Sequence, residues 1–290
     1  LNQQKLTLSD GESDLEIQNL LEIDDANEGL ITGDADLELK QGISISAGEV
    51  TSTAGTVAIN GTSNLSSGTL SVSSGTLALG GSFEKNGGTL SFSDSSFSLL
   101  DNLSWTSDSL LEIKTLELDN FSLTLGSASS DLKIIDPLIL DHVDEKLISG
   151  AADLEFSGLL NISLGELSSS NGKIQLEQGV FLSGGKLTVP NSTLVIGNQF
   201  NKSGGSANLA GASLQLYSDL SLTSDTLLSV QSLDLNQQKL TLSDGESDLE
   251  IQNLLEIDHE NEGLITGNAD LELKQGISIN AGEVNSSAGT

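Results

Sequence analysis

The residues best suited to chemistry are carboxylates that recur at fixed spacing along the sequence. Calcium takes six to eight oxygen ligands, mostly from carboxylate and carbonyl groups. Five carboxylates have acidic equivalents in two later copies of the same segment, and they are the candidate calcium ligands: Asp14, Asp24, Glu28, Asp36 and Glu38. The calcium-binding nonapeptide GGxGxDxUx is absent. This favours the alternative, a solvated acidic face that has no true cofactor and binds Ca²⁺ only loosely.

Catalytic chemistry has little support in the residue types. Glycosidases place paired carboxylates at defined separations, usually beside aromatic sugar platforms. Here the single Trp, Trp105, and the single Tyr, Tyr217, are each replaced by Leu at the equivalent position of the other copy. No GxSxG, HExxH or P-loop motif occurs. We therefore predict no catalytic residues and no enzyme activity.

Histidine and lysine each appear at two equivalent positions. His142 and His259 each follow an Asp and lie far apart in the sequence, which is typical of surface turns rather than of one shared metal site. Lys85 and Lys202 fall on an otherwise apolar column. Two interpretations stay open for Lys85: it lies in a turn after a strand that ends at Phe83, or it is tucked against a carboxylate.

The overall charge excludes several partners. The formal net charge is −31, all 11 basic residues are Lys, and Cys is absent. Such a surface repels nucleic acid and anionic membranes. No apolar run reaches the ~20 residues of a membrane helix. We expect no nucleic-acid partner, no membrane insertion and no disulfide framework.

The elements that must position these residues are repeated on three scales. Residues 235–290 match residues 1–56 at 50 of 56 positions, and residues 118–234 align without a gap to residues 1–117 with 46 identities. We therefore divide one continuous solenoid, 1–290, into repeat A (1–117), repeat B (118–234) and the start of the next repeat A (235–290). The sequence is interpreted as a stretch of a polymer with a 234-residue period, or alternatively as a segment of a larger protein.

The shortest repeat determines the fold. Gly48, Gly68 and Gly88 recur at its step, and so does an apolar column: Leu30, Val50, Leu70, Leu90 and Leu110. Segments such as TLSV and TLAL alternate apolar and polar residues, which is typical of β-strands. The pattern predicts an all-β, three-sided parallel β-solenoid with about 20 residues per coil. A shorter remainder, placed in a short coil near 13–29 and again near 130–146, predicts six coils and a rise of roughly 29 Å per 117-residue unit.

Three segments resemble a known family: SSGTLSVSSGTLALGGSF (66–83), NGGTLSFSDSSFSLLDNLSW (86–105) and SGGKLTVPNSTLVIGNQF (183–200). They are similar to the right-handed β-helix shafts of bacterial filamentous haemagglutinin-like adhesins and giant tandem-repeat surface proteins. The resemblance implies a right-handed coil, secretion and display at the cell surface.

Together these features predict an extracellular structural protein that forms a filament, tube wall or surface shaft. The expected partners are other copies of the chain, through self-association along and between repeats, and other surface components. One alternative is the shaft of an adhesin whose binding domain lies elsewhere, and another is a soluble carbohydrate-active or ligand-binding module.

Overall fold

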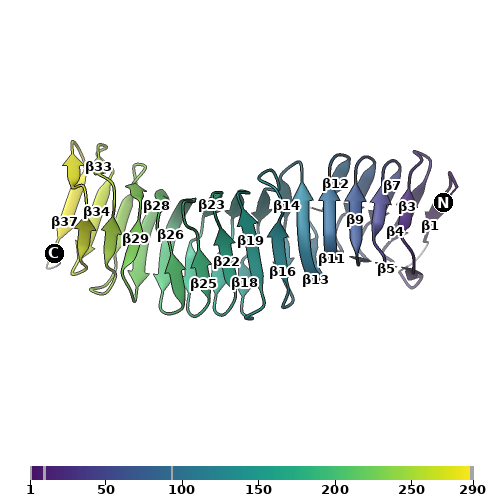
Figure 1. The fold of residues 1–290 in the computed structure, drawn as a ribbon, viewed down its shortest axis with the longest axis horizontal. Helices are drawn as coiled ribbons and strands as arrows, with labels where there is room; N and C mark the ends of the chain where they lie inside the picture. Colours follow the sequence, from purple (N-terminus) through teal and green to yellow (C-terminus); the bar gives the residue numbers. More distant parts are fainter. Residues whose placement is uncertain (1, 9–10, 93, 288–290) are drawn as a thin grey trace. The chain divides into compact units, whose positions relative to one another are not determined.

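A computed structural model describes residues 2–8, 11–92 and 94–287. The chain divides into a first unit, Leu1–Ile135, and a second unit, Asp136–Thr290. Every regular element among the described residues is a β-strand, and the two units together hold about 14 turns of a β-solenoid (Figure 1). Among these residues, no helix has the length and apolar character needed to span a bilayer. The predicted all-β parallel solenoid is confirmed.

In the first unit the strands of successive coils pair in parallel and form three ladders. Ladder one contains β1 (Lys5–Thr7), β4 (Gly29–Gly33), β7 (Glu49–Ser52), β10 (Thr69–Val72) and β12 (Thr89–Ser91). Ladder two contains β2 (Leu15–Ile17), β5 (Leu37–Leu39), β8 (Thr56–Ile59), the first halves of β11 (Thr76–Lys85) and β13 (Ser96–Ser107), and β15 (Thr115–Glu117). Ladder three contains β3 (Leu21–Ile23), β6 (Ile43–Ile45), β9 (Thr62–Leu65), the second halves of β11 and β13, and β16 (Ser122–Leu125). Two further strands pair with each other, β14 (Leu111–Ile113) and β17 (Leu132–Ile134).

The second unit has the same three ladders, again with parallel pairing. Ladder one contains β19 (Lys146–Gly150), β22 (Glu166–Ser169), β25 (Lys186–Thr188) and β27 (Ser206–Asn208). Ladder two contains β20 (Leu154–Phe156), β23 (Lys173–Leu176), the first halves of β26 (Thr193–Lys202) and β28 (Ser213–Ser224), and β30 (Ser232–Asp234). Ladder three contains β18 (Leu138–Leu140), β21 (Leu160–Ile162), β24 (Val180–Leu182), the second halves of β26 and β28, β31 (Lys239–Leu242), β34 (Gly263–Gly267) and β37 (Glu283–Ser286). Two shorter ladders complete it: β29 (Leu228–Val230), β32 (Leu249–Ile251) and β35 (Leu271–Leu273); and β33 (Leu255–Ile257) with β36 (Ile277–Ile279).

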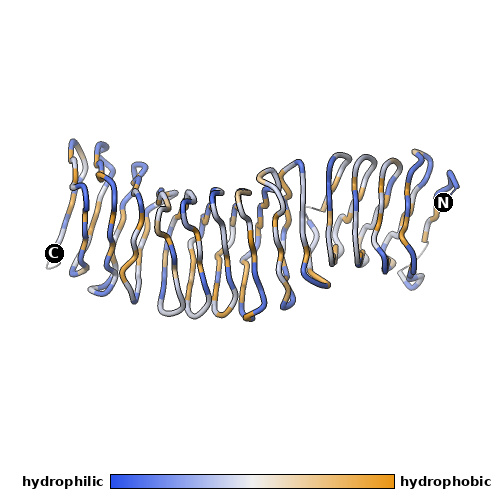
Figure 2. The backbone as a smooth tube through the Cα atoms, in the orientation of Figure 1, coloured by the Kyte–Doolittle hydropathy of each residue, from blue (hydrophilic) through white to orange (hydrophobic). Residues whose placement is uncertain are grey.

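The core of each unit is a stack of inward-facing apolar side chains. Leu30 pairs with Val50, and Val50 with Leu70, and all three are 0–1% exposed. Apolar and polar residues alternate along most of the strands, and the hydropathy of the residues is drawn on the backbone in Figure 2. In the first unit an aromatic stack joins this core, because the Phe83 and Trp105 rings lie parallel with centroids 4.6 Å apart. Stability therefore comes mainly from contacts between neighbouring coils, as in other repeat proteins.

The number of coils in each 117-residue repeat is five and two thirds, slightly fewer than the six expected from the spacing. In the first unit, Leu6 lies in β1 of ladder one, but its equivalent Leu123 lies in β16 of ladder three. Strand β16 is five coil steps beyond β3, and β3 is two strands beyond β1. The second unit gives the same count, from Leu147 in ladder one to Leu264 in ladder three.

The physical reason is that the extra residues lengthen coils and form no short one. Leu6 pairs with Leu30, and Leu15 pairs with Leu37, and both separations in sequence exceed the regular step from Val50 to Leu70. The acidic loops between these strands absorb the remainder that was expected to form a separate coil. At ~4.8 Å per coil, one repeat rises about 27 Å, and equivalent residues appear on a different face in the next repeat.

Candidate functional site

Two of the five candidate calcium ligands, Asp14 and Asp36, cap strands in successive coils. The Asp14 carboxylate accepts the backbone N–H of Asp36 at 3.2 Å, and the Asp36 carboxylate accepts the backbone N–H of Thr56 at 2.6 Å. The same contact recurs in the second unit, where Asp153 accepts the N–H of Lys173 at 2.7 Å. Recurrence of these aspartates in every repeat therefore has a structural cause, since each satisfies a backbone donor of the next coil.

Asp24 and Glu28 lie together in a tight acidic turn between β3 and β4. The Glu28 residue is 4% exposed, and its carboxylate accepts the backbone N–H groups of Asp24 at 3.0 Å and Gln3 at 3.2 Å. These hydrogen bonds lower the pKa of Glu28 to about 2, and the bond from Asp24 has a larger effect than the bond from Gln3. Glu145 and Glu262 occupy the equivalent turns of the second unit and accept the N–H groups of Asp141 and Asp258. The buried glutamate thus closes its own turn.

The fifth candidate, Glu38, is ion-paired with Lys40, and Lys40 Nζ also lies 3.6 Å from the carboxylate of Glu16 in the preceding coil. In the part of the chain that the structure describes, no group of three or more acidic or His side chains is placed to hold a metal ion. The structure therefore brings Asp14, Asp36 and Glu38 to the walls of one groove and Asp24 next to Glu28, but it does not bring the five together.

We expect Glu28→Gln to destabilise its turn at neutral pH and to have little effect near pH 2. Because the pKa of Glu28 is lowered, its stabilisation is present above the ordinary pKa of 4.5 and is lost as the pH falls through about 2. The measurement is hydrogen exchange at the Asp24 amide in the two proteins between pH 6 and pH 2. Glu22→Gln, at an exposed glutamate of β3, is the control. Equal protection of Asp24 in both variants at pH 6 would contradict this role.

The two histidines lie in turns, as the sequence predicts. His142 is half-buried, and its Nδ1 accepts the backbone N–H of Asp144 at 3.3 Å. His259 makes the equivalent bond to the N–H of Asn261 at 3.2 Å. Each imidazole therefore accepts a backbone N–H within the same turn that contains the buried glutamate, Glu145 or Glu262.

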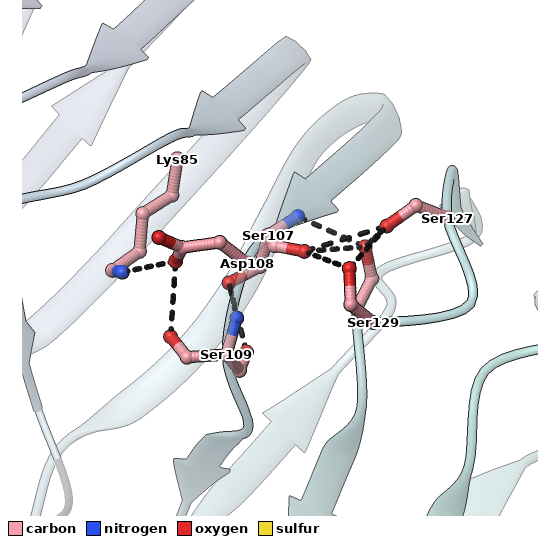
Figure 3. Close-up of polar contacts among 7 residues, drawn as sticks. Lys85, Ser107, Asp108, Ser109, Ser127 and Ser129 are labelled. Atoms are coloured by element: carbon pink, nitrogen blue, oxygen red, sulfur yellow. Dashed lines mark hydrogen bonds and ion pairs between the residues drawn. The ribbon is translucent and has the colours of Figure 1, made fainter.

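Lys85 lies against a carboxylate, which decides between the two interpretations of the sequence. Strand β11 continues to Lys85, so it does not end at Phe83. The Lys85 side chain is 10% exposed, and its ammonium is ion-paired with Asp108 of the next coil (Figure 3). Lys202 and Asp225 form the same pair in the second unit, where the Lys side chain is 3% exposed. The pair therefore joins two coils at the same corner of both units.

A cluster of serines surrounds this pair in the first unit (Figure 3). The Ser107 carbonyl accepts the hydroxyls of Ser129 at 2.9 Å and Ser127 at 3.3 Å, and the Ser107 N–H donates to Ser130 Oγ at 2.9 Å. In the second unit the Ser224 N–H donates to Ser247 Oγ at 3.0 Å. Sequence reasoning missed this cluster, although the serine at positions 13, 130 and 247 in every repeat was a usable signal.

The chemistry of the corner is that of a structural staple. The hydroxyls of Ser107 and Ser129 donate to backbone carbonyls. The Lys85 ammonium is engaged by Asp108, which in turn accepts a hydrogen bond from Ser109 at 3.3 Å. The hydrogen bond from Lys85 lowers the pKa of Asp108, and the bond from Ser109 adds a smaller effect in the same direction. The carboxylate therefore stays ionised beside the ammonium. The Lys85–Asp108 pair and the Ser129 hydroxyl join successive coils, whereas the Ser107 and Ser109 hydroxyls bond within one turn.

Comparisons with known proteins gave no relative. No protein-family model matches the chain, no curated protein matches it, and no solved structure matches it.

Proposed function

We propose that this chain is part of an extracellular structural shaft, built by coil stacking and associated laterally into a filament or tube wall. The observation that carries the proposal is the ladder architecture of each unit. Among the described residues the coils pair in parallel with their neighbours over an apolar core. The repeated residues include the Asp caps and the Lys–Asp staples, which join coils, and the buried glutamates, which close turns. The resemblance to haemagglutinin-like shafts supports the extracellular location. A catalytic role has no comparable support, and we propose none.

The two repeats differ where a lateral contact would be made. Ile139, Val143 and Leu164 of repeat B are 54%, 64% and 58% exposed. Repeat A has Glu22, Ala26 and Ala47 at the equivalent positions. Exposed apolar side chains on an otherwise acidic surface favour association at repeat B, while Glu22 and the two small alanines leave less apolar surface at these positions of repeat A.

The fractional coil count affects how such shafts would associate. If each repeat advances five and two thirds coils, three repeats complete 17 whole coils. A residue present in every repeat then returns to the same face only after about 82 Å. Lateral contacts would be distributed over all three faces, which favours bundles and closed walls over flat ribbons.

The first measurement is electron microscopy of the 290-residue chain at high concentration, with and without millimolar Ca²⁺. We expect filaments or tubes with axial features spaced about 27 or 54 Å apart, the rise of one or two repeats. Melting temperatures in EDTA are measured beside them, because loosely bound Ca²⁺ on the acidic turns would raise both assembly and stability. Isolated thin particles under every condition would contradict lateral assembly and favour the shaft of an adhesin.

A further inference from the structure

We propose that two open grooves, one in each unit, bind a neutral polysaccharide chain that lies along the coil axis. They lie between ladders two and three, at the corner that precedes β6 and β9 in the first unit and β24 in the second. Their volumes are about 500 and 770 Å³. Both grooves include two equivalent positions, Leu20 with Pro137 and Gln41 with Gly158. The two grooves therefore share one corner of the coil, although most of their lining residues differ.

The corner is concave because glycines with positive φ turn the chain there. Gly42 and Gly179 have φ of +97° and +86°, and a Cβ on either would lie 1.9 Å from the carbonyl oxygen of the adjacent coil. Successive coils therefore approach closely at Gly42 and Gly179, where a side chain on the glycine would meet the backbone of the adjacent coil. Side chains on both sides of the glycines form the walls.

Amides and hydroxyls dominate the groove walls. The first groove is lined by Gln18, Asn19, Leu20, Gln41, Ile43, Ser44, Thr62 and Asn64. The second has Gln178, Asn198, Gln199, Asn201, Ser221 and Thr223, together with Pro137, Gly158, Leu159, Phe200 and Asp219. Neither lining contains Lys or His. The one carboxylate, Asp219, accepts the backbone N–H of Lys239 at 2.8 Å.

Several of these polar side chains have hydrogen-bonding capacity that no described residue uses. Within the described chain, the side chains of Gln41, Gln199 and Asn201 make no hydrogen bond. Since a primary amide offers both donors and an acceptor, these groups match a ligand rich in hydroxyls, which also donate and accept.

The charge and length of the groove narrow the ligand class. A polyanion would need cations in the walls, and none is there, while the chain carries a net charge of −31. A basic peptide would need clustered carboxylates. The second groove extends from Pro137 to Thr223 across five coils, about 19 Å at the spacing of strands. A short stretch of an uncharged, extended glycan fits these three conditions.

Neither groove lining has an exposed aromatic side chain, so each groove alone should bind a glycan weakly, with a Kd of about 1 mM. Repetition along a shaft would raise the apparent affinity for a long glycan, since the second contact is intramolecular. This proposal does not depend on lateral assembly, because each groove is formed within one unit of a single chain.

The test is nuclear magnetic resonance titration of the ¹⁵N-labelled chain with three neutral probes, namely cello-, malto- and chito-oligosaccharides, and with heparin as a polyanion. We expect a neutral probe to shift the side-chain amide signals of Gln199 and Asn201, and of Gln41 and Asn64. The double variant Gln199→Ala/Asn201→Ala should weaken binding at the second groove about tenfold, the loss of two neutral hydrogen bonds. The first groove should be unaffected, which provides an internal control.

Asn171→Ala removes an exposed amide outside both grooves and is the matched control. It should bind as the unchanged protein does. No shift with any neutral probe, shifts with heparin alone, or equal weakening by Asn171→Ala would each overturn the proposal. These outcomes are independent of the microscopy, so failure to assemble and failure to bind glycan are distinguished.

Discussion

Replacing Gly179 by alanine is expected to unfold the surrounding coils of the second unit at much lower denaturant concentration. The residue has φ of +86°, which costs an L-amino acid about 1–2 kcal/mol. The added Cβ would also lie 1.9 Å from the carbonyl oxygen of Gln199, a backbone atom fixed by ladder pairing. The coils must therefore separate, and we expect a total loss of about 3 kcal/mol or more, at the high end for a single substitution.

Gly211→Ala is the matched control for that substitution. Its φ of +82° imposes the same backbone strain, but its Cβ would meet first the side-chain oxygen of Asn191, which can rotate away. We expect a loss of about 1 kcal/mol. The measurement is urea unfolding followed by circular dichroism, with hydrogen exchange to locate the opened coils. Equal losses in the two variants would show that the close approach at Gly179 has no energetic consequence.

The ladders are the part of the fold that the sequence predicts best. Leu30, Val50, Leu70 and Leu90 pair in the expected order, because a regular step with strict alternation fixes which side chains point inward. The column fails at its last member. Leu110 is 56% exposed, and its neighbour Leu111 begins β14 and is buried. Because Leu110 and Leu111 are adjacent and identical in type, the sequence alone does not indicate which of the two is buried.

The coil count and the staple depend on long-range geometry that spacing alone does not reveal. Phe83 pairs with Trp105, because a register shift after Leu79 aligns Gly81 with Leu103. This shift places Lys85 opposite Ser107, next to Asp108, whereas a regular step of 20 residues would have placed it opposite Trp105. The candidate site was predicted less well for a related reason. Acidic residues recur because they satisfy backbone donors, and residue type alone does not distinguish such a cap from a metal ligand.

Removing Asp225 is expected to destabilise the second unit far more than removing its partner, Lys202. Asp225→Ala leaves a Lys side chain that is 3% exposed without its carboxylate. Loss of one partner of a fully buried pair costs about 3–5 kcal/mol, and because Asp225 is 40% exposed we expect about 2 kcal/mol here. Lys202→Met keeps much of the side chain's length, removes the buried charge and should change stability by less than about 1 kcal/mol.

The double variant distinguishes a charge effect from a packing effect. Once methionine fills the position of Lys202, no unpaired ammonium remains, so adding Asp225→Ala should cost little more. Lys239→Met, at a side chain that is 44% exposed and paired with Glu283, is the surface control and should be nearly neutral. All four proteins are compared by the urea midpoint of unfolding. If Lys202→Met were as damaging as Asp225→Ala, the ion pair that links the two coils would be a net source of stability, rather than a buried charge that its partner only neutralises.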